Sequence, residues 1–205
     1  MKIRSKVKNT VLAGLAGLTL TACGGGGGGG AAGVIDNFVD NDLTNLSGSA
    51  SLVSSYSTLL SDFQSVVSSG DISAIQGVIT GPDATDIAQA KTLITQLNQA
   101  QALWDQTEAL IDAQTDEAKY TIYNSDSFKE AHAAMLYLQN HVKPVIQKVA
   151  NGNTITLADY NLVSKADKAN EIIEQEKQTN SKNYADTKKI KSVTTVNNDT
   201  DEITD

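Results

Sequence analysis

Apolar residues recur every three or four positions over most of the chain between residues 34 and 173, which is the spacing of one face of an α-helix. Serine, threonine, glutamine and charged residues occupy the positions between them. This pattern predicts four long amphipathic helices. Their apolar stripes are Leu52, Tyr56, Leu59, Phe63 and Val66; then Ile87, Ala90, Ile94, Leu97, Gln101, Trp104, Glu108, Ile111, Thr115, Ala118 and Ile122; then Phe128, Ala131, Met135, Leu138, Val142, Val145 and Val149; and finally Leu162, Ala166, Ala169 and Ile173.

Capping residues and helix breakers predict where these helices begin and end. Three starts are expected, at Asp83, at a Ser127/Glu130 capping box and at a Thr156/Asp159 capping box. The second stripe predicts one helix from Asp83 to about Lys119, Pro144 is expected to kink the third helix, and the last is expected to end near Lys177. Shorter helices are predicted over residues 33–46, interrupted by Gly48, and over 71–79, between Gly70 and the Gly81-Pro82 break.

The sequence therefore predicts an all-α fold, an antiparallel helical bundle of about four main helices. The β-branched runs at residues 154–156 and 194–196 are too short and isolated to predict strands. We expect the bundle domain over residues 34–179. Residues 180–205 are rich in Asn, Thr, Lys and Asp without an apolar face, which predicts a disordered tail.

The first 23 residues have the organisation of a secretory signal. Four basic residues lie among the first eight, and the apolar stretch from Val11 to Leu20 is too short to span a bilayer. Leu20-Thr21-Ala22-Cys23 follows, and Cys23 is the only cysteine of the chain. The pattern resembles the lipobox of bacterial lipoproteins. The resemblance implies removal of residues 1–22 by cleavage between Ala22 and Cys23, a thioether-linked diacylglycerol on Cys23 and a further acyl chain on its amine.

A glycine run follows the cysteine directly, from Gly24 to Gly30, and Ala31, Ala32 and Gly33 extend it. Glycine chains are flexible, and ten such residues have an end-to-end distance on the order of 17 Å. Residues 23–33 are therefore predicted to be a lipidated tether. The glycine run resembles tethers of Gram-negative surface lipoproteins, and Gly24 resembles the outer-membrane sorting pattern. These resemblances imply a lipid anchor in the outer membrane, with the domain facing either the periplasm or the cell surface.

Composition and charge exclude some partners. The chain is 40% hydrophobic and 20% charged, as in globular proteins, and no later segment has 20 consecutive apolar residues. Removal of residues 1–22 takes four of the 16 basic residues and none of the 24 acidic ones, so the net charge changes from −8 to −12. Nucleic acid is therefore not an expected partner. The carboxylates concentrate before residue 129 and the lysines after it, which is typical of solvated helix surfaces or of two halves that pair.

The sequence predicts no catalytic, cofactor or metal site. His132 and His141 are nine residues apart and would project from opposite faces of one helix. The chain has no CxxCH, HExxH, Glu-x-x-His or GxSxG motif, and its glycine run lacks the Lys-Ser/Thr ending of a phosphate loop. The acidic clusters at residues 112–117 and 171–176 are typical of wet helix faces. An envelope hydrolase is accordingly the least supported hypothesis.

Six residues are candidate contacts for a ligand or partner. Trp104, Gln101, Met135 and His132 lie on or beside the stripes, whereas Tyr120 and Tyr123 are expected at a helix end, either in core contacts or in an exposed patch. The favoured hypothesis is a non-enzymatic, lipid-anchored envelope protein that binds the membrane through Cys23 and an envelope or surface protein through its domain. The alternative is a carrier of a small apolar ligand or haem in the bundle core.

Overall fold

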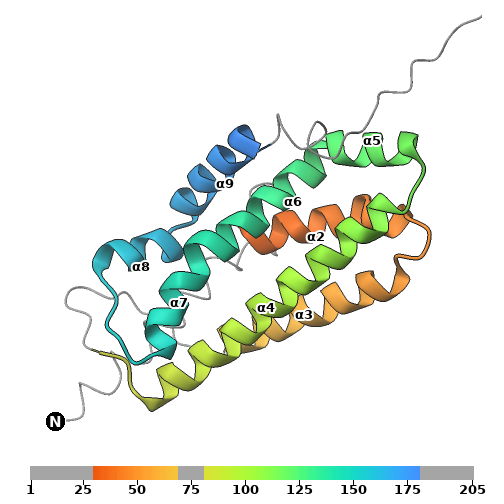
Figure 1. Cartoon of the computed structure of the whole chain (residues 1–205). Helices are drawn as coiled ribbons and strands as arrows, with labels where there is room; N and C mark the ends of the chain where they lie inside the picture. The colour runs from red at the N-terminus through yellow and green to blue at the C-terminus, as the bar shows by residue number, and fades with distance from the viewer. Residues whose placement is uncertain (1–29, 69–80, 181–205) are drawn as a thin grey trace, which may run out of the picture.

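The computed structural model describes residues 30–68 and 81–180 (Figure 1), and within these ranges the chain is all-α and contains no strand. The predicted signal peptide, Cys23, residues 24–29, the predicted helix over residues 71–79 and residues 181–205 lie outside the described part. The elements in chain order are α2 (Ala31–Asn41), η1 (Leu43–Asn45, a 3₁₀ turn), α3 (Ala50–Ser68), α4 (Ala84–Asp112), α5 (Asp116–Asn124), α6 (Asp126–Tyr137), η2 (Leu138–Val142, a π-helical turn), α7 (Lys143–Ala150), α8 (Leu157–Ser164) and α9 (Ala166–Asn180).

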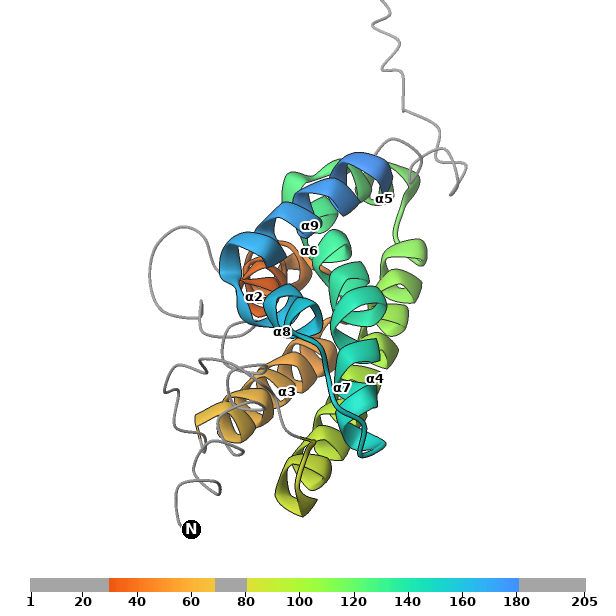
Figure 2. The same ribbon diagram turned by 90° about the vertical axis from the view of Figure 1, so that its left-hand side faces the viewer.

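The helices form a bundle in which neighbours pack lengthwise. Helix α3 lies antiparallel beside α4, and α4 packs against α7 on its other side (Figure 1). Helix α2 packs on α6, and α9 covers a further face of α6 (Figure 2). The predicted helical bundle is therefore confirmed, although it is built from more and shorter helices than the stripes predicted.

The buried core is made largely of the predicted apolar stripes. From the first two stripes it takes Leu52, Tyr56, Leu59, Phe63, Ala90, Leu97, Trp104, Ile111 and Ile122, and from the last two Phe128, Ala131, Met135, Leu138, Val142, Val145, Val149, Ala169 and Ile173. Ile35, Phe38 and Val39 of α2 are also part of it. Burial of this shared face is what stabilises helices that would be marginal in isolation.

Two predicted helix starts are confirmed by their hydrogen bonds. The Asp83 carboxylate accepts from the backbone N–H of Thr85 and Asp86, and Asp86 accepts from the N–H of Asp83. At α8 the side chains of Thr156 and Asp159 make the same reciprocal pair. Gly48 has a φ of 87°, a left-handed conformation that explains why a glycine separates η1 from α3.

The predicted start at Ser127 is wrong. Ser125 caps α6, because its hydroxyl accepts from the backbone N–H of Phe128. The Ser127 hydroxyl instead donates to the carboxylate of Asp42, which joins α6 to the end of α2. Ser127 thus contacts a residue 85 positions away, and the Glu130 carboxylate accepts from Lys177 of α9.

The long helix predicted from Asp83 to Lys119 is also wrong in extent. Helix α4 ends at Asp112, and α5 starts at Asp116 with Thr115 as its N-cap. The Thr115 hydroxyl accepts from the N–H of Ala118. Two acidic residues follow in the first turn, where their charges interact favourably with the positive end of the helix dipole. The apolar spacing continues across the break, so periodicity alone did not reveal it.

A change in the type of helix precedes Pro144, the residue at which a kink was predicted. The helix changes to a π-helical turn over Leu138–Val142, in which the N–H of Lys143 donates to the carbonyl of Leu138, five residues earlier. Pro144 then lies in the first turn of α7. A proline ring crowds the carbonyl four residues earlier and provides no donor, and a π turn just before it accommodates both effects.

Three further boundaries are corrected. Helix α2 begins at Ala31, and Ala31 and Ala32 are buried, so these residues belong to the domain and not to the tether. The helix predicted over residues 33–46 ends at Asn41 and continues as η1. The last predicted helix is two helices, since Lys165 is extended between α8 and α9, and α9 runs to Asn180.

Candidate functional site

The strongest concentration of aromatic side chains surrounds Trp104. Its indole stacks on Phe128 with ring centroids 5.3 Å apart and on His132 at 5.8 Å. Phe38 contacts both Trp104 and Phe128, and Tyr123 meets Phe128 edge-on at 5.0 Å. The cluster joins α2, α4, α5 and α6, so four segments distant in sequence share one packing unit.

Two carboxylates accept hydrogen bonds from Trp104 and Tyr123 of this aromatic cluster. The indole Nε1 of Trp104 donates to Glu108 at 2.8 Å, and the Tyr123 hydroxyl donates to Asp112 at 2.6 Å. Burial, and secondarily the hydrogen bond to Asp112, raise the pKa of Tyr123 far above its ordinary value. The phenol is therefore a fixed donor, and both carboxylates serve as acceptors for buried groups.

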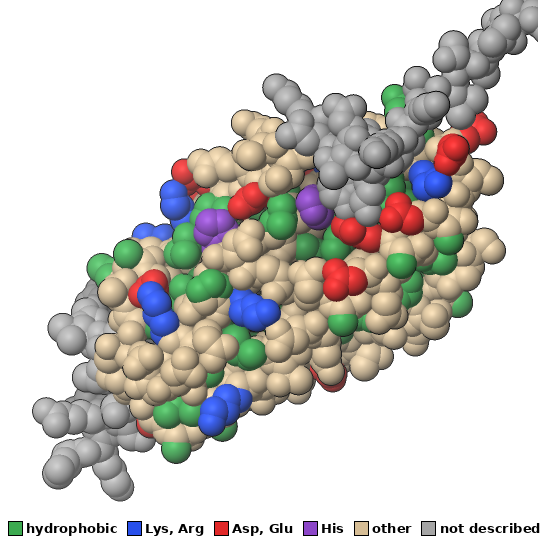
Figure 3. All heavy atoms as spheres, in the orientation of Figure 1, with side chains coloured by type: hydrophobic (Ala, Val, Ile, Leu, Met, Phe, Trp, Pro, Cys, Tyr) green, Lys and Arg blue, Asp and Glu red, His purple; other side chains and the backbone are tan. Residues whose placement is uncertain are grey.

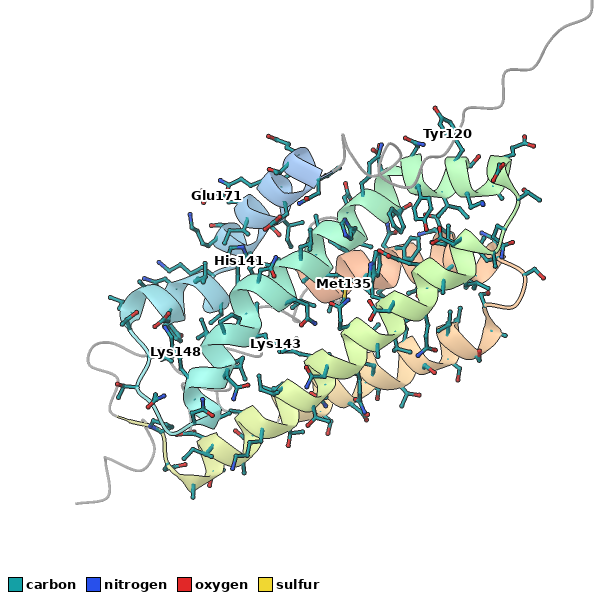
Figure 4. All side chains as sticks on the ribbon, in the orientation of Figure 1. Tyr120, Met135, His141, Lys143, Lys148 and Glu171 are labelled. Atoms are coloured by element: carbon teal, nitrogen blue, oxygen red, sulfur yellow. The ribbon has the colours of Figure 1, made fainter. Side chains whose placement is uncertain are left out.

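The six predicted contact residues do not form one site. Trp104 and His132 are brought together by stacking, whereas Met135 is buried near the C-terminal end of α6 and borders a separate cavity (Figure 4). Gln101 donates to Asp105 on the same helix at 2.8 Å. Tyr123 is in the core, while Tyr120 is 39% exposed and points outward from α5 (Figure 4). Of the two alternatives left open for these tyrosines, core contact applies to Tyr123 and exposure to Tyr120.

Met135 borders an apolar cavity between α2, α3, α4 and the π-helical turn. The lining residues are Ala32, Ile35, Tyr56, Leu59, Leu60, Phe63, Leu93, Leu97, Ala100, Met135, Leu138, Val142 and Ile146. The cavity has a volume of about 30 Å³. Pockets for drug-sized ligands measure roughly 300–1,000 Å³. A haem or a similar ligand would therefore fit only if the helices that line the cavity moved apart.

The two histidines have separate surroundings. His132 belongs to the aromatic cluster, while His141 stacks on Tyr137 and lies 3.4 Å from Glu176 of α9. In the part of the chain that the structure describes, no group of three or more His, Cys, Asp or Glu side chains is placed to hold a metal ion. Lys177 of α9 pairs with Glu130 of α6 at 2.7 Å, and this partner raises the pKa of Lys177.

The surface shows an uneven distribution of charge. In Figure 3 several lysines gather toward the end formed by α7 and α8, and carboxylates gather toward the opposite end. The pairs Lys177–Glu130 and Lys148–Asp159 join residues within the lysine-rich part of the chain. These pairs dock α9 on α6 and α8 on α7.

Two hollows on the surface were not predicted from the sequence. One lies on the solvent side of α3 and α4 and is lined by Ser54, Ser55, Thr58, Leu59, Asp62, Gln99, Ala102, Leu103 and Gln106, with a volume of about 380 Å³. We call it the α3–α4 groove. The other lies between η1 and α5 and is lined by Asp42, Asn45, Leu46, Thr115, Glu117, Ala118, Thr121 and Ile122. The sequence signal for the first is the nearly uncharged polar face of α3.

Comparison with protein-family models, with curated proteins and with solved structures gave no match to this chain. What the structure defines is the class, an all-α helical bundle. Across residues 30–68 and 81–180, none of the helices combines the length and apolar character needed to cross a bilayer.

Proposed function

We propose that this chain is a lipid-anchored, non-enzymatic protein of the bacterial outer membrane whose helical domain binds a partner in the cell envelope. The observation that carries the proposal is the single cysteine, Cys23, which directly follows a short apolar run ending in Leu20-Thr21-Ala22 and directly precedes a glycine run. Two or three acyl chains on one cysteine hold a protein stably at a membrane, whereas one gives marginal binding.

The position of the folded domain relative to Cys23 supports an anchoring role. The first helix of the described part begins at Ala31, and the carbonyl of Gly30 accepts from the N–H of Gly33 at 2.9 Å. In the sequence, Gly24 to Gly29 lie between the cysteine and the described residues, and a glycine chain of that length has a typical end-to-end distance of about 13 Å. The domain would stand close to the headgroups without being inserted among them.

The hydrogen bonding of the aromatic cluster supports a structural role for its carboxylates. Glu108 and Asp112 lie beside the candidate contacts Trp104 and Tyr123 and accept hydrogen bonds from them. A carboxylate that holds a buried ring in place by a hydrogen bond stabilises the fold. This favours a binding protein over an envelope hydrolase.

The alternative function, carriage of a small apolar ligand, is favoured by one observation, the apolar cavity beside Met135. Its volume of about 30 Å³ matches a single water molecule. A carrier would need this space to expand about tenfold to reach the usual size of a ligand pocket. We therefore rank carriage below partner binding.

Detergent phase partitioning and crosslinking test the two parts of the proposal. Wild-type protein from the native membrane should enter the detergent phase, and Cys23→Ser protein should remain with the aqueous phase. A photocrosslinking amino acid at exposed Tyr120 and another at exposed Ser57 would sample two surfaces in intact cells. A discrete adduct from either position supports partner binding. Partitioning of the wild-type protein into the aqueous phase would contradict lipid anchoring. The absence of adducts from both positions would contradict partner binding.

A further inference from the structure

The α3–α4 groove offers unused hydrogen-bonding groups. Among the residues that the structure describes, the side chains of Ser54, Asp62, Gln99 and Gln106 have no hydrogen-bond partner, and all four line this groove. Together they provide a hydroxyl, a carboxylate and two amides. The groove therefore presents both donors and acceptors along two neighbouring helices.

Two further hydroxyls add acceptors to the same groove. Ser55 donates to the carbonyl of Ser51 at 2.9 Å, and Thr58 donates to that of Ser54 at 3.0 Å. Each donor hydrogen is thereby committed to the helix backbone, but the oxygen lone pairs point away from that bond and can accept. This arrangement fixes the two hydroxyls in position, which reduces the entropy lost when a ligand binds.

Apolar groups form the remainder of the lining. Leu59 is buried and Leu103 is half-buried beneath the polar rim, and the small side chain of Ala102 leaves room between the helices. An apolar base with a few polar groups around it is the usual composition of a small-molecule site, and the volume of about 380 Å³ is within the usual range.

The charge around the groove selects the chemistry of a ligand. Asp62 is the only charged residue in α3, and α4 has none between Lys91 and Asp105. In a chain with a net charge of −8, this is a nearly neutral surface. An anionic ligand would meet a carboxylate without a cation in the groove, and a cationic ligand would find a single partner.

The groove between η1 and α5 has a similar volume, but its polar side chains differ in their hydrogen bonding. Asp42 accepts from Ser127, Asn45 donates to the carbonyl of Asn41, Thr115 caps α5, and Thr121 donates to the carbonyl of Glu117. Most of its polar side chains already have intramolecular partners. Unused polar capacity thus distinguishes the α3–α4 groove.

We propose that the α3–α4 groove binds a neutral oligosaccharide. Sugar hydroxyls donate and accept at once, as the two amides and Ser54 can, and the carboxylate of Asp62 can accept from two neighbouring hydroxyls. The C–H face of a sugar ring would lie on Leu59, Ala102 and Leu103. The inference goes beyond membrane anchoring and does not depend on lipidation of Cys23.

Saturation-transfer NMR on the full-length mature protein tests this inference, in a detergent without sugar headgroups. The probes are chitohexaose and maltohexaose, which separate recognition of acetamido groups from recognition of hydroxyls alone. We expect transfer to the ring protons of at least one probe. The double substitution Gln99→Ala/Gln106→Ala, and separately Asp62→Ala, should weaken binding roughly tenfold, since each removes groups that would hydrogen-bond the ligand. The control Gln175→Ala, exposed on α9, should bind as wild type.

All these side chains are exposed, so circular dichroism and melting of the variants should match wild type. The proposal is overturned if neither sugar binds at concentrations up to about 10 mM. It is equally overturned if the groove variants and the α9 control bind alike. Sedimentation of the same samples gives a third outcome: a dimer that the groove substitutions dissociate would show that a second copy of the chain covers the groove, and would also overturn it.

Discussion

The indole N–H of Trp104 donates to the carboxylate of Glu108, one turn further along α4, at 2.8 Å. The ring is 3% exposed and stacks on Phe128, so the carboxylate satisfies the one polar atom of a core side chain. The buried Trp104 thus requires a charged residue, Glu108, beside it in the same stripe as its hydrogen-bond acceptor. Glu108 interrupts the apolar pattern because the indole needs an acceptor.

Replacement of Trp104 should therefore destabilise the fold strongly. Trp104→Ala is expected to lower the free energy of unfolding by about 3–5 kcal/mol, through lost burial and a cavity between α2, α4 and α6. Tyr120→Ala on the exposed side of α5 should change it by less than ~0.5 kcal/mol. Denaturant titration measures both. Equal effects of the two substitutions would show that the indole is not part of the core.

Alkaline pH should destabilise the protein through its buried tyrosines. Burial raises the pKa of Tyr56 and of Tyr137 to about 12, from an ordinary 10.0. Between these values the folded protein keeps phenolic protons that the unfolded chain has released, so stability falls as the pH rises. Each tyrosine contributes a slope of about 1.4 kcal/mol per pH unit.

Tyr137→Phe provides the test of this pH dependence. It should reduce the slope of unfolding free energy against pH above about pH 10 by one tyrosine's contribution. Near neutral pH it should cost only about 1 kcal/mol, from the lost hydrogen bond to the carbonyl of Leu162. An unchanged alkaline slope would mean that Tyr137 ionises freely in the folded state.

The fold class was predictable from the sequence because apolar spacing determines which face a helix buries. The breaks between helices within one apolar stripe were harder to predict from the sequence. Thr115 followed by two acidic residues is a recognisable helix start, but the apolar spacing continues through it. Neither glycine nor proline marks the break at Lys165. Ser127 matched a capping box, yet its hydroxyl is bound by Asp42, a tertiary contact that no local pattern contains.

Gln96 of α4 should tolerate an apolar replacement. It is 6% exposed, and its Oε1 has no hydrogen-bond partner among the described residues. An unsatisfied buried acceptor opposes folding, so Gln96→Leu is expected to leave stability unchanged or raise it by about 1 kcal/mol. Gln99→Leu, exposed one turn away, should have no such gain. A clear loss of stability in the Gln96 variant, measured by thermal melting, would reveal a partner for this oxygen.

The proposed glycine tether should be separable from the fold. Deletion of Gly25 to Gly29 is expected to leave the melting temperature within about 2 °C of wild type, since a glycine coil adds no packed contacts. Ala32→Asp should instead lower it markedly, because it places a charge in the core at the first turn of α2. A large loss on glycine deletion would show that the run packs against the bundle.

The candidate binding surface illustrates what a sequence leaves open. The scarcity of charge in α3 was visible, but whether its serines meet the glutamines of α4 depends on how the two helices are aligned. That alignment is fixed by side chains on the opposite faces, such as the buried pair of Tyr56 and Thr107, whose hydroxyls lie 3.2 Å apart. The groove follows from tertiary packing.

Mass spectrometry of the mature N-terminus tests the central claim, lipid anchoring at Cys23, most directly. Protein isolated from the membrane of its native host should begin at Cys23 and carry the added mass of a diacylglycerol, with or without a further amide-linked acyl chain. The Cys23→Ser protein should retain residues 1–22 and carry no lipid. A wild-type chain that begins at another residue, or that begins at an unmodified Cys23, would contradict the account.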